Sequence, residues 1–249
     1  MEKTSFLGIP LSIFTLPELA EKVNLSIAQK RPLTICNINI HAINQFKKNA
    51  DFRKSLLDSD FVICDSDIIR ILCSVFKRKK VYKLTGSRWI IEYLEQHQSG
   101  LRIFLLGDED TTLDKSCTYI SRFQSVSAID KHNGFFEESE IGSVLEKINQ
   151  FKPDILLVGM GMPKQEIFID TFKTQLLPCV FVPVGGAFKY WAGIYKQAPN
   201  IILKLNLEWL HRIYQEPGRL LKRYVYDSFY FFINFIKHII SSRNQSGIK

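Results

Sequence analysis

Short apolar runs alternate with longer amphipathic segments along most of this chain, and this alternation restricts the fold more than any other feature. Strands are predicted at 33–40, 61–64, 102–107, 126–129, 154–159 and 179–186. Helices are predicted at 42–58, 66–77, 87–98, 111–124, 138–151 and 163–176. Such alternation is typical of an α/β fold with a mostly parallel sheet that helices cover on both faces.

The composition agrees with a folded globular protein. The chain has 249 residues, 46% hydrophobic and 23% charged, enough for one large domain or a domain with an appendage. We expect no signal peptide and no membrane span, since no uncharged apolar run reaches about 18 residues. The five cysteines are scattered without a Cys-x-x-Cys pair, which favours reduced thiols in a cytosolic protein without structural zinc.

After Pro199 the alternation stops, and the remaining sequence has a helical pattern. We therefore predict an α/β domain at 1–194 and a helical appendage at 195–249. The appendage holds nine lysines and arginines against three acids, which is +6 of the chain's +8. This excess indicates an anionic partner such as a membrane surface, a phosphorylated lipid or nucleic acid; the alternative is a solvated charged face.

The appendage also contains an aromatic stretch, in which seven of the twelve residues at 224–235 are aromatic. Apolar residues recur at helical spacing from Leu221 to Ile240, beside a narrow polar stripe that includes Asp227. This pattern predicts a helix that lies on a membrane without crossing it. The alternative is that the apolar face packs on the catalytic domain or on a second subunit. The aromatic residues are spaced as in a buried face, so we expect no nucleic-acid partner.

Ligands of parallel sheets bind beyond the carboxyl ends of the strands, so the residues that follow each strand are candidates. In "GMGMPKQE", Gly159 and Gly161 allow close backbone approach, and Pro163 suits the first turn of a helix. Free N–H groups at that helix start would favour an anion, and Gln165 and Glu166 could reach the same cleft. The segment is neither a P-loop nor a dinucleotide fingerprint, and a plain tight turn is the alternative.

Two carboxylates follow the apolar strand in "FVICDSD". Asp65 at the strand end could act as a general base. Asp65 and Asp67 together could instead bind Mn²⁺ or Mg²⁺ in a metal-dependent sugar-nucleotide transferase. A third interpretation is that Asp67 only caps the next helix.

Three arginines occur in "EWLHRIYQEPGRLLKR", at positions 212, 219 and 223. Guanidinium groups on one approximate helix face would suit a diphosphate, although Pro217 and Gly218 interrupt the helical path. The alternative is a surface of salt bridges with Glu208 and Glu216.

Taken together, "GMGMPKQE", "VPVGGAFKYWAG", "APN", "EWLHRIYQEPGRLLKR" and the aspartate after the second strand resemble the WecG/TagA/CpsF family of bacterial glycosyltransferases. The resemblance implies a Rossmann-like catalytic domain and a membrane-associating C-terminal appendage. It implies inverting transfer, without metal or cofactor, from a UDP-sugar to a polyprenyl-diphosphate-linked sugar in cell-surface polysaccharide synthesis. The donor would be an N-acetylhexosamine such as UDP-ManNAc, and the protein would lie peripherally on the cytoplasmic face of the plasma membrane.

On this resemblance, Asp65 is the catalytic base and the three arginines, Arg212, Arg219 and Arg223, bind the acceptor or leaving diphosphate. The residues expected at the nucleotide-sugar are Asn37, Asn39, Lys83, Gly159, Gly161, Lys164, Gln165, Glu166, Gly185 and Gly186.

Several residues depart from the family pattern around the presumed sugar and acceptor region: Ile35, which replaces the threonine of an early Thr-x-Asn, and Ser66, Lys83, Arg88, Lys189 and Gln197. These departures leave the identity of the sugar undecided. They also leave the alternative that the protein binds a nucleotide-sugar at the membrane surface without catalysis. A homo-oligomer is compatible with the sequence.

Overall fold

The computed structural model describes residues 2–98 and 100–246, and within these ranges it describes no side chain at 77, 219 or 238–246. Its centre is a six-stranded sheet in the order β4-β3-β8-β7-β5-β6, and every neighbouring pair is parallel. The strands are β3 (Leu33–Ile38), β4 (Phe61–Cys64), β5 (Leu101–Gly107), β6 (Val126–His132), β7 (Ile155–Gly159) and β8 (Val180–Pro183). The predicted α/β fold with a parallel sheet is therefore confirmed.

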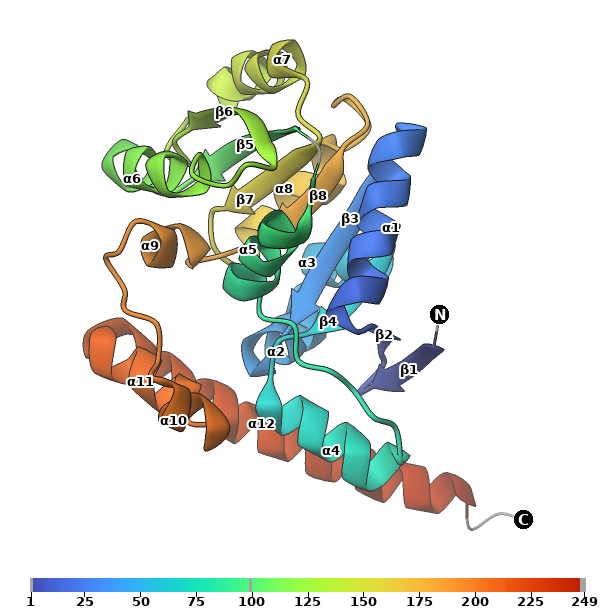
Figure 1. The fold of residues 1–249 in the computed structure, drawn as a ribbon. Helices are drawn as coiled ribbons and strands as arrows, with labels where there is room; N and C mark the ends of the chain where they lie inside the picture. Colours follow the sequence, from blue (N-terminus) through green and yellow to red (C-terminus); the bar gives the residue numbers. More distant parts are fainter. Residues whose placement is uncertain (1, 99, 247–249) are drawn as a thin grey trace.

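Helices cover both faces of this sheet (Figure 1). One face carries α1 (Leu16–Gln29), α5 (Gly86–Gln96), α6 (Asp110–Ile120) and α9 (Ala187–Trp191), and the other carries α2 (Ile40–Lys48), α3 (Ala50–Leu57), α7 (Ile141–Phe151) and α8 (Lys164–Phe172). Alternate residues of β5 belong to different cores: Ile103 packs under the first layer and Phe104 under the second. Burial on both faces explains why the strands are nearly continuous apolar runs.

Part of the N-terminal structure was not predicted from the sequence. A hairpin of β1 (Glu2–Phe6) and β2 (Ile9–Ile13) precedes α1. The helix predicted at 42–58 is wrong as a single element, because Asn49 separates α2 from α3. The Asn49 side chain accepts a hydrogen bond from the Phe52 backbone N–H at 3.0 Å and so begins the second helix.

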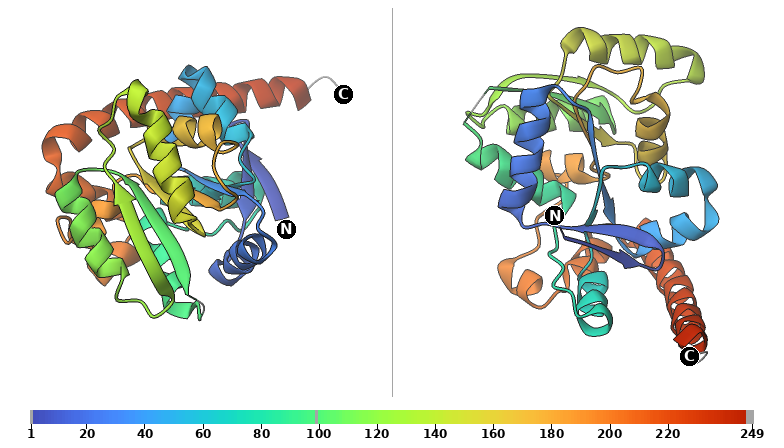
Figure 2. Two further views of the ribbon diagram at one scale, coloured as in Figure 1. Left: turned by 90° about the horizontal axis from the view of Figure 1, so that it is seen from above. Right: turned by 90° about the vertical axis from the view of Figure 1, so that its right-hand side faces the viewer.

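The C-terminal region is helical, as expected, and consists of α10 (Asn200–Lys204), α11 (Glu208–Gln215) and the long α12 (Pro217–Ser246). α11 ends just before Pro217, which opens α12. The middle of α12 packs on α2 and the hairpin, and Phe231 is fully buried in the same core as Phe6 (Figures 1 and 2). One face of α12 thus belongs to the core.

The opposite face of α12 remains exposed, with Val225 and Phe229 each about two-thirds accessible. None of the described helices contains an apolar stretch of the length needed to cross a bilayer.

Candidate active site

A cavity of about 610 Å³ opens beside the carboxyl ends of β3 and β4. Helix α4 (Asp67–Lys77) forms one wall, and α11 and α12 form the other. The lining residues are Asn39, Ile40, His41, Asp65, Ser66, Asp67, Ile68, Ile71, Lys83, Asn206, Glu208, Trp209, Arg212, Ile213, Leu221, Arg223, Tyr224, Val225, Asp227 and Ser228. The cavity therefore lies between the sheet and the C-terminal helices and needs both for its walls.

Asp65 lies in this cavity directly after β4. Its backbone N–H donates to the Ile38 carbonyl at 2.8 Å, so the end of β3 fixes its place. Burial raises the pKa of its carboxyl to about 6, although Arg212, Lys83 and a hydrogen bond with Thr85 act in the opposite direction. A carboxylate with this pKa suits a general base that works near neutral pH.

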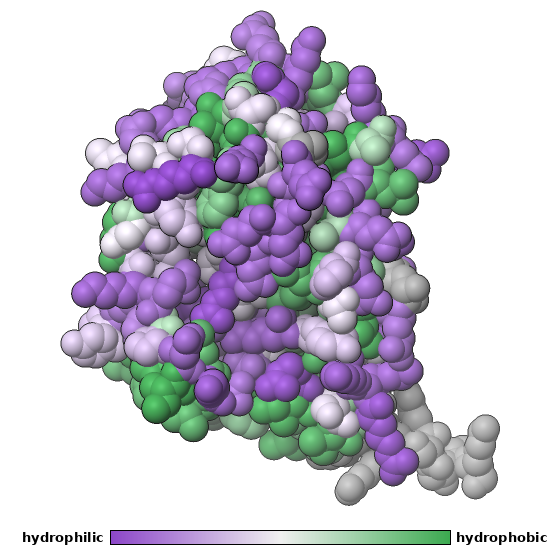
Figure 3. Space-filling view, viewed as in Figure 1, coloured by the Kyte–Doolittle hydropathy of each residue, from purple (hydrophilic) through white to green (hydrophobic). Residues whose placement is uncertain are grey.

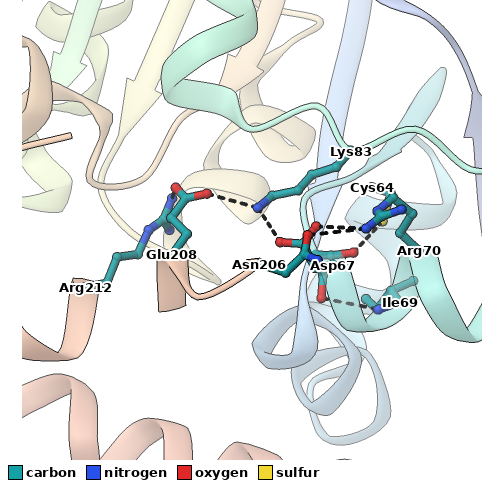
Figure 4. A network of polar contacts seen from close by, with 9 residues as sticks. Cys64, Asp67, Ile69, Arg70, Lys83, Asn206, Glu208 and Arg212 are labelled. Carbon is teal, nitrogen blue, oxygen red and sulfur yellow. Dashed lines mark hydrogen bonds and ion pairs between the residues drawn. The ribbon is translucent and has the colours of Figure 1, made fainter. Parts of the chain in front are cut away.

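Lys83 connects the two walls of the cavity (Figure 4). Its ammonium group lies 2.7 Å from Asp67 Oδ2 on α4 and 2.9 Å from Glu208 Oε2 on α11. Burial would lower the pKa of Lys83, but its hydrogen bonds to these carboxylates raise it above its ordinary value. Lys83 is therefore a fixed positive charge in the same cavity as Asp65.

Arg212 continues this network, since its guanidinium donates to Glu208 Oε1 at 2.9 Å (Figure 4). Burial would raise the pKa of Glu208, but the positive charges of Arg212 and Lys83 outweigh the effect of burial and lower this pKa to about 2. Among the described residues, the buried Nε–H of Arg212 has no hydrogen-bond partner. The site thus retains a donor for a ligand oxygen.

Of the other two predicted arginines, Arg223 on α12 lines the cavity. The backbone of Arg219 belongs to α12, but its side chain lies outside the described side chains.

Asp67 does not cap the helix that it begins. The capping residue of α4 is Ser66, whose hydroxyl accepts from the Ile69 N–H at 3.4 Å. Asp67 instead pairs with Lys83 and, at 3.4 Å, with Arg70. Within residues 2–98 and 100–246, no three His, Cys, Asp or Glu side chains are grouped so that they could hold a metal ion.

The two asparagines of the first predicted strand have different places. Asn37 lies within β3, and its amide nitrogen would be 3.3 Å from a Cβ atom at Gly86. Asn39 follows the strand and caps α2, where its side-chain oxygen accepts from the Ala42 N–H at 3.0 Å. Only Asn39 lines the cavity.

The glycine-rich segment lies outside the cavity lining, at the ends of β7 and β8. A Cβ atom at Gly159 would lie 2.4 Å from the Phe188 ring, so this glycine has a packing role. Gly161 and Gly185 have φ of 80° and 54°, in the left-handed region that glycine tolerates best. The Gln165 side-chain oxygen accepts from the backbone N–H of both, at 3.2 and 3.0 Å. Gln165 therefore joins the two glycine loops.

The remaining predicted donor residues surround these loops. Glu166 is buried, which raises the pKa of its carboxyl to about 7, and it accepts from the Gln165 amide at 2.8 Å. Lys164 is exposed at the start of α8, and Gly186 precedes α9. Together with Gly159, Gly161, Gln165 and Gly185, these residues stay predictions for the donor site.

Sequence reasoning missed a polar pair in the cavity wall. His41 Nδ1 lies 2.8 Å from Asp227 Oδ2, and the Asn44 amide donates to the Asp227 side chain at 3.0 Å. The only signal in the sequence was an acidic residue within the aromatic stretch at 224–235. Its partner on α2 lies 186 positions away, and no local pattern could identify it.

Comparisons with known proteins identify the family of this chain. The family model described as "Glycosyl transferase WecG/TagA/CpsF family" matches residues 4–245. An N-acetylglucosaminyldiphosphoundecaprenol N-acetyl-beta-D-mannosaminyltransferase from Staphylococcus aureus strain MW2 is 26% identical over 88% of this chain and 87% of its own length. The protein with the same name from strain MRSA252 is 27% identical over 88% of each chain. The resemblance seen in the motifs is thus confirmed: the chain is a glycosyltransferase that belongs to the WecG/TagA/CpsF family.

Proposed function

We propose that this glycosyltransferase moves an N-acetylhexosamine from a UDP-sugar, with N-acetylmannosamine as the first candidate, to a sugar on polyprenyl diphosphate. The observation that carries the proposal is that one cavity holds Asp65 together with Lys83 and Arg212. The names of the relatives support the acceptor class and the transferred sugar.

In the proposed reaction, Asp65 accepts the proton of the acceptor hydroxyl as its oxygen attacks the anomeric carbon. The new C–O bond forms while the bond to the diphosphate breaks, and UDP leaves with the electron pair. A single displacement inverts the anomeric centre. A base of this kind contributes typically about 10²- to 10⁴-fold to the rate.

The negative charge that develops on the leaving diphosphate needs fixed cations or dipoles. Lys83 and Arg212 are suited to this because carboxylates already hold both in place. Arg223 lines the same cavity and is a candidate for binding the acceptor diphosphate. Arg219 is a second candidate, which rests on the sequence alone. We propose that no metal ion takes part.

The acceptor's lipid chain requires an apolar surface near the diphosphate. Ile68 and Ile71 of α4 face this cavity from one wall, and Leu221 and Val225 of α12 from the other. Exposed apolar residues continue along α10 and α11, where Ile201, Leu205 and Tyr214 are each more than half accessible. These features support a peripheral position on the cytoplasmic face of the membrane, with the C-terminal helices toward the lipid.

The test is a screen of UDP-sugars for UDP release with a short-chain lipid-diphosphate-linked N-acetylglucosamine in detergent. We expect turnover with one UDP-N-acetylhexosamine and unchanged turnover in excess EDTA. Loss of activity in EDTA with recovery on Mn²⁺ would instead support a metal site at Asp65 and Asp67. Binding of UDP-sugars without release of UDP would identify a non-catalytic protein.

The matched variant is Asp65→Asn, which keeps the shape of the side chain and removes its basicity. We expect kcat to fall by about 10²-fold or more while the Kd for UDP changes only a few-fold. Wild-type turnover in this variant would show that another group is the base.

A further inference from the structure

Helix α4 and the loop that follows it combine exposed apolar and basic residues outside the C-terminal appendage. The sequence from 75 to 80 is "VFKRKK", and between Ile68 and Lys83 the chain has six basic residues and no acid. A cluster of four consecutive basic residues beside an amphipathic helix is typical of segments that bind anionic lipid.

The two faces of α4 differ sharply. Ile69 and Cys73 are fully buried in the core beneath the helix, whereas Val75 is 64% and Phe76 55% exposed. Arg78, Lys79 and Lys80 follow at the helix end and are all exposed. Apolar side chains thus stand next to positive charges at one end of the molecule.

This surface is continuous with two others. The Phe76 ring contacts the Phe235 ring of α12 at a centroid distance of 5.4 Å, so α4 and α12 lie side by side. Toward its N-terminus α4 lines the cavity through Ile68 and Ile71. Figure 3 shows apolar surface along the lower edge of the molecule, where α4, α10 and α11 lie in Figure 1.

We propose that Val75 to Lys80 is a second membrane-contact element, in which Val75 and Phe76 enter the interface and the basic loop binds anionic headgroups. A nucleic acid would use the charges but would leave the exposed parts of Val75 and Phe76 in water. The anionic bilayer satisfies both. With this element the membrane touches both walls of the cavity, α4 on one side and α11 and α12 on the other.

The experiment is sedimentation of the full chain with phosphatidylcholine vesicles that contain or lack phosphatidylglycerol. Each basic residue near an anionic surface contributes roughly 1 kcal/mol, or about fivefold in partitioning, so Arg78→Gln with Lys80→Gln should weaken binding about 25-fold. Val75→Ser should weaken vesicle binding by about fivefold, because the exposed apolar side chain that enters the interface is lost.

Lys30→Gln with Arg31→Gln is the matched control. It removes the same charge from exposed positions at the end of α1, opposite α4 in Figure 1, and should leave vesicle binding unchanged. Thermal unfolding of each variant separates loss of binding from loss of fold.

The proposal is overturned if the Arg78 and Lys80 variant binds vesicles like the wild type, or if the control loses as much. It is also overturned if the wild type binds vesicles equally well with and without phosphatidylglycerol. A further contrary result is an Arg78 and Lys80 variant that loses affinity for duplex DNA but keeps its affinity for vesicles. The proposal rests on the proposed function only in that a lipid-linked acceptor would bring the protein to a membrane. The vesicles carry no acceptor sugar, so a wild type that binds them but transfers no sugar contradicts the function alone.

Discussion

The carboxyl of Asp65 differs from an aspartate in water because the protein surrounds it. Burial raises its pKa to about 6, while Arg212 and Lys83 hold that rise in check. The same residue type at position 67 has two cations beside it and serves a different purpose. Two aspartates two positions apart are thus in different electrostatic surroundings.

We expect kcat/KM to fall on the acid side with an apparent pKa near 6, because the base must be ionised to accept a proton. Below that pH the rate should drop tenfold per unit. Lys83→Met should move this limb to higher pH, since the lysine lowers the pKa of Asp65, whereas Lys83→Arg should keep it in place. A limb near pH 4 in the wild type would contradict the buried environment of the base.

At the scale of elements, Lys83 links α4 to α11 through its ion pairs with Asp67 and Glu208. Lys83 is 20% and Glu208 10% exposed in their side chains, so their ion pair is screened less than a surface pair. The interaction holds the C-terminal helices against the end of the sheet beside Asp65.

A double-mutant cycle of Lys83→Met and Glu208→Gln measures that link. We expect a coupling of about 1–3 kcal/mol in the free energy of unfolding, because the two groups form part of one buried network. The control pair Lys54 and Asp58, with 65% and 47% exposed side chains, should couple much more weakly because solvent screens it. Equal coupling in both cycles would reduce Lys83 to a surface contact.

The second inter-element link joins α12 to α2 through Asp227. Burial would raise the pKa of Asp227, but hydrogen bonds from His41 and Asn44 outweigh it and lower that pKa. A depressed pKa means that the interaction stabilises the fold at neutral pH and is lost as the pH falls through the folded-state value.

Asp227→Asn should therefore lower the free energy of unfolding by about 1–3 kcal/mol near pH 7, or Tm by about 2–4 °C per kcal/mol. The difference from the wild type should shrink in acid, which denaturant titrations at several pH values can check. The control is Asp51→Asn, which changes an exposed aspartate on α3 in the same way. A deficit that stays constant down to low pH would assign the effect to packing alone.

On the scale of the whole molecule, the C-terminal helices complete the fold as well as the cavity. Phe231 is fully buried, and its ring stacks on that of Phe6 in the hairpin with the ring centroids 6.4 Å apart. The outer face of the same helix is exposed. One helix therefore serves the core on one side and an external surface on the other.

A chain that ends at residue 194 should keep its sheet but lose stability, because Phe6 and its neighbours become exposed. We expect a lower Tm, increased binding of a hydrophobic dye and no transfer, since Arg212 and half of the cavity wall are absent. A truncated chain as stable as the full one would show that α12 is only an appendage.

The sequence by itself determined the parallel sheet and most of the helices around it, because hydrophobic period and strand ends are local. Strand ends, short motifs and the family resemblance also proposed Asp65, Lys83 and Arg212 as site residues, and all three line one cavity. The sequence did not reveal the hairpin or α1, whose runs are short and mixed in polarity. It also could not separate α2 from α3, since an asparagine in a helical pattern becomes a cap only when its side chain turns to the backbone.

Only the tertiary structure decided which residues share the cavity. Glycine spacing pointed to the loops after β7 and β8, yet the structure gives Gly159 a packing role against Phe188 and leaves these loops outside the cavity lining. The structure places the Lys83 ammonium group 2.7 Å from Asp67 and 2.9 Å from Glu208, although 125 positions separate Lys83 from Glu208 in the sequence. The pKa of Asp65 and the fixed charge of Lys83 arise from burial and Coulomb interactions among these residues, and both depend on distances that no local pattern encodes.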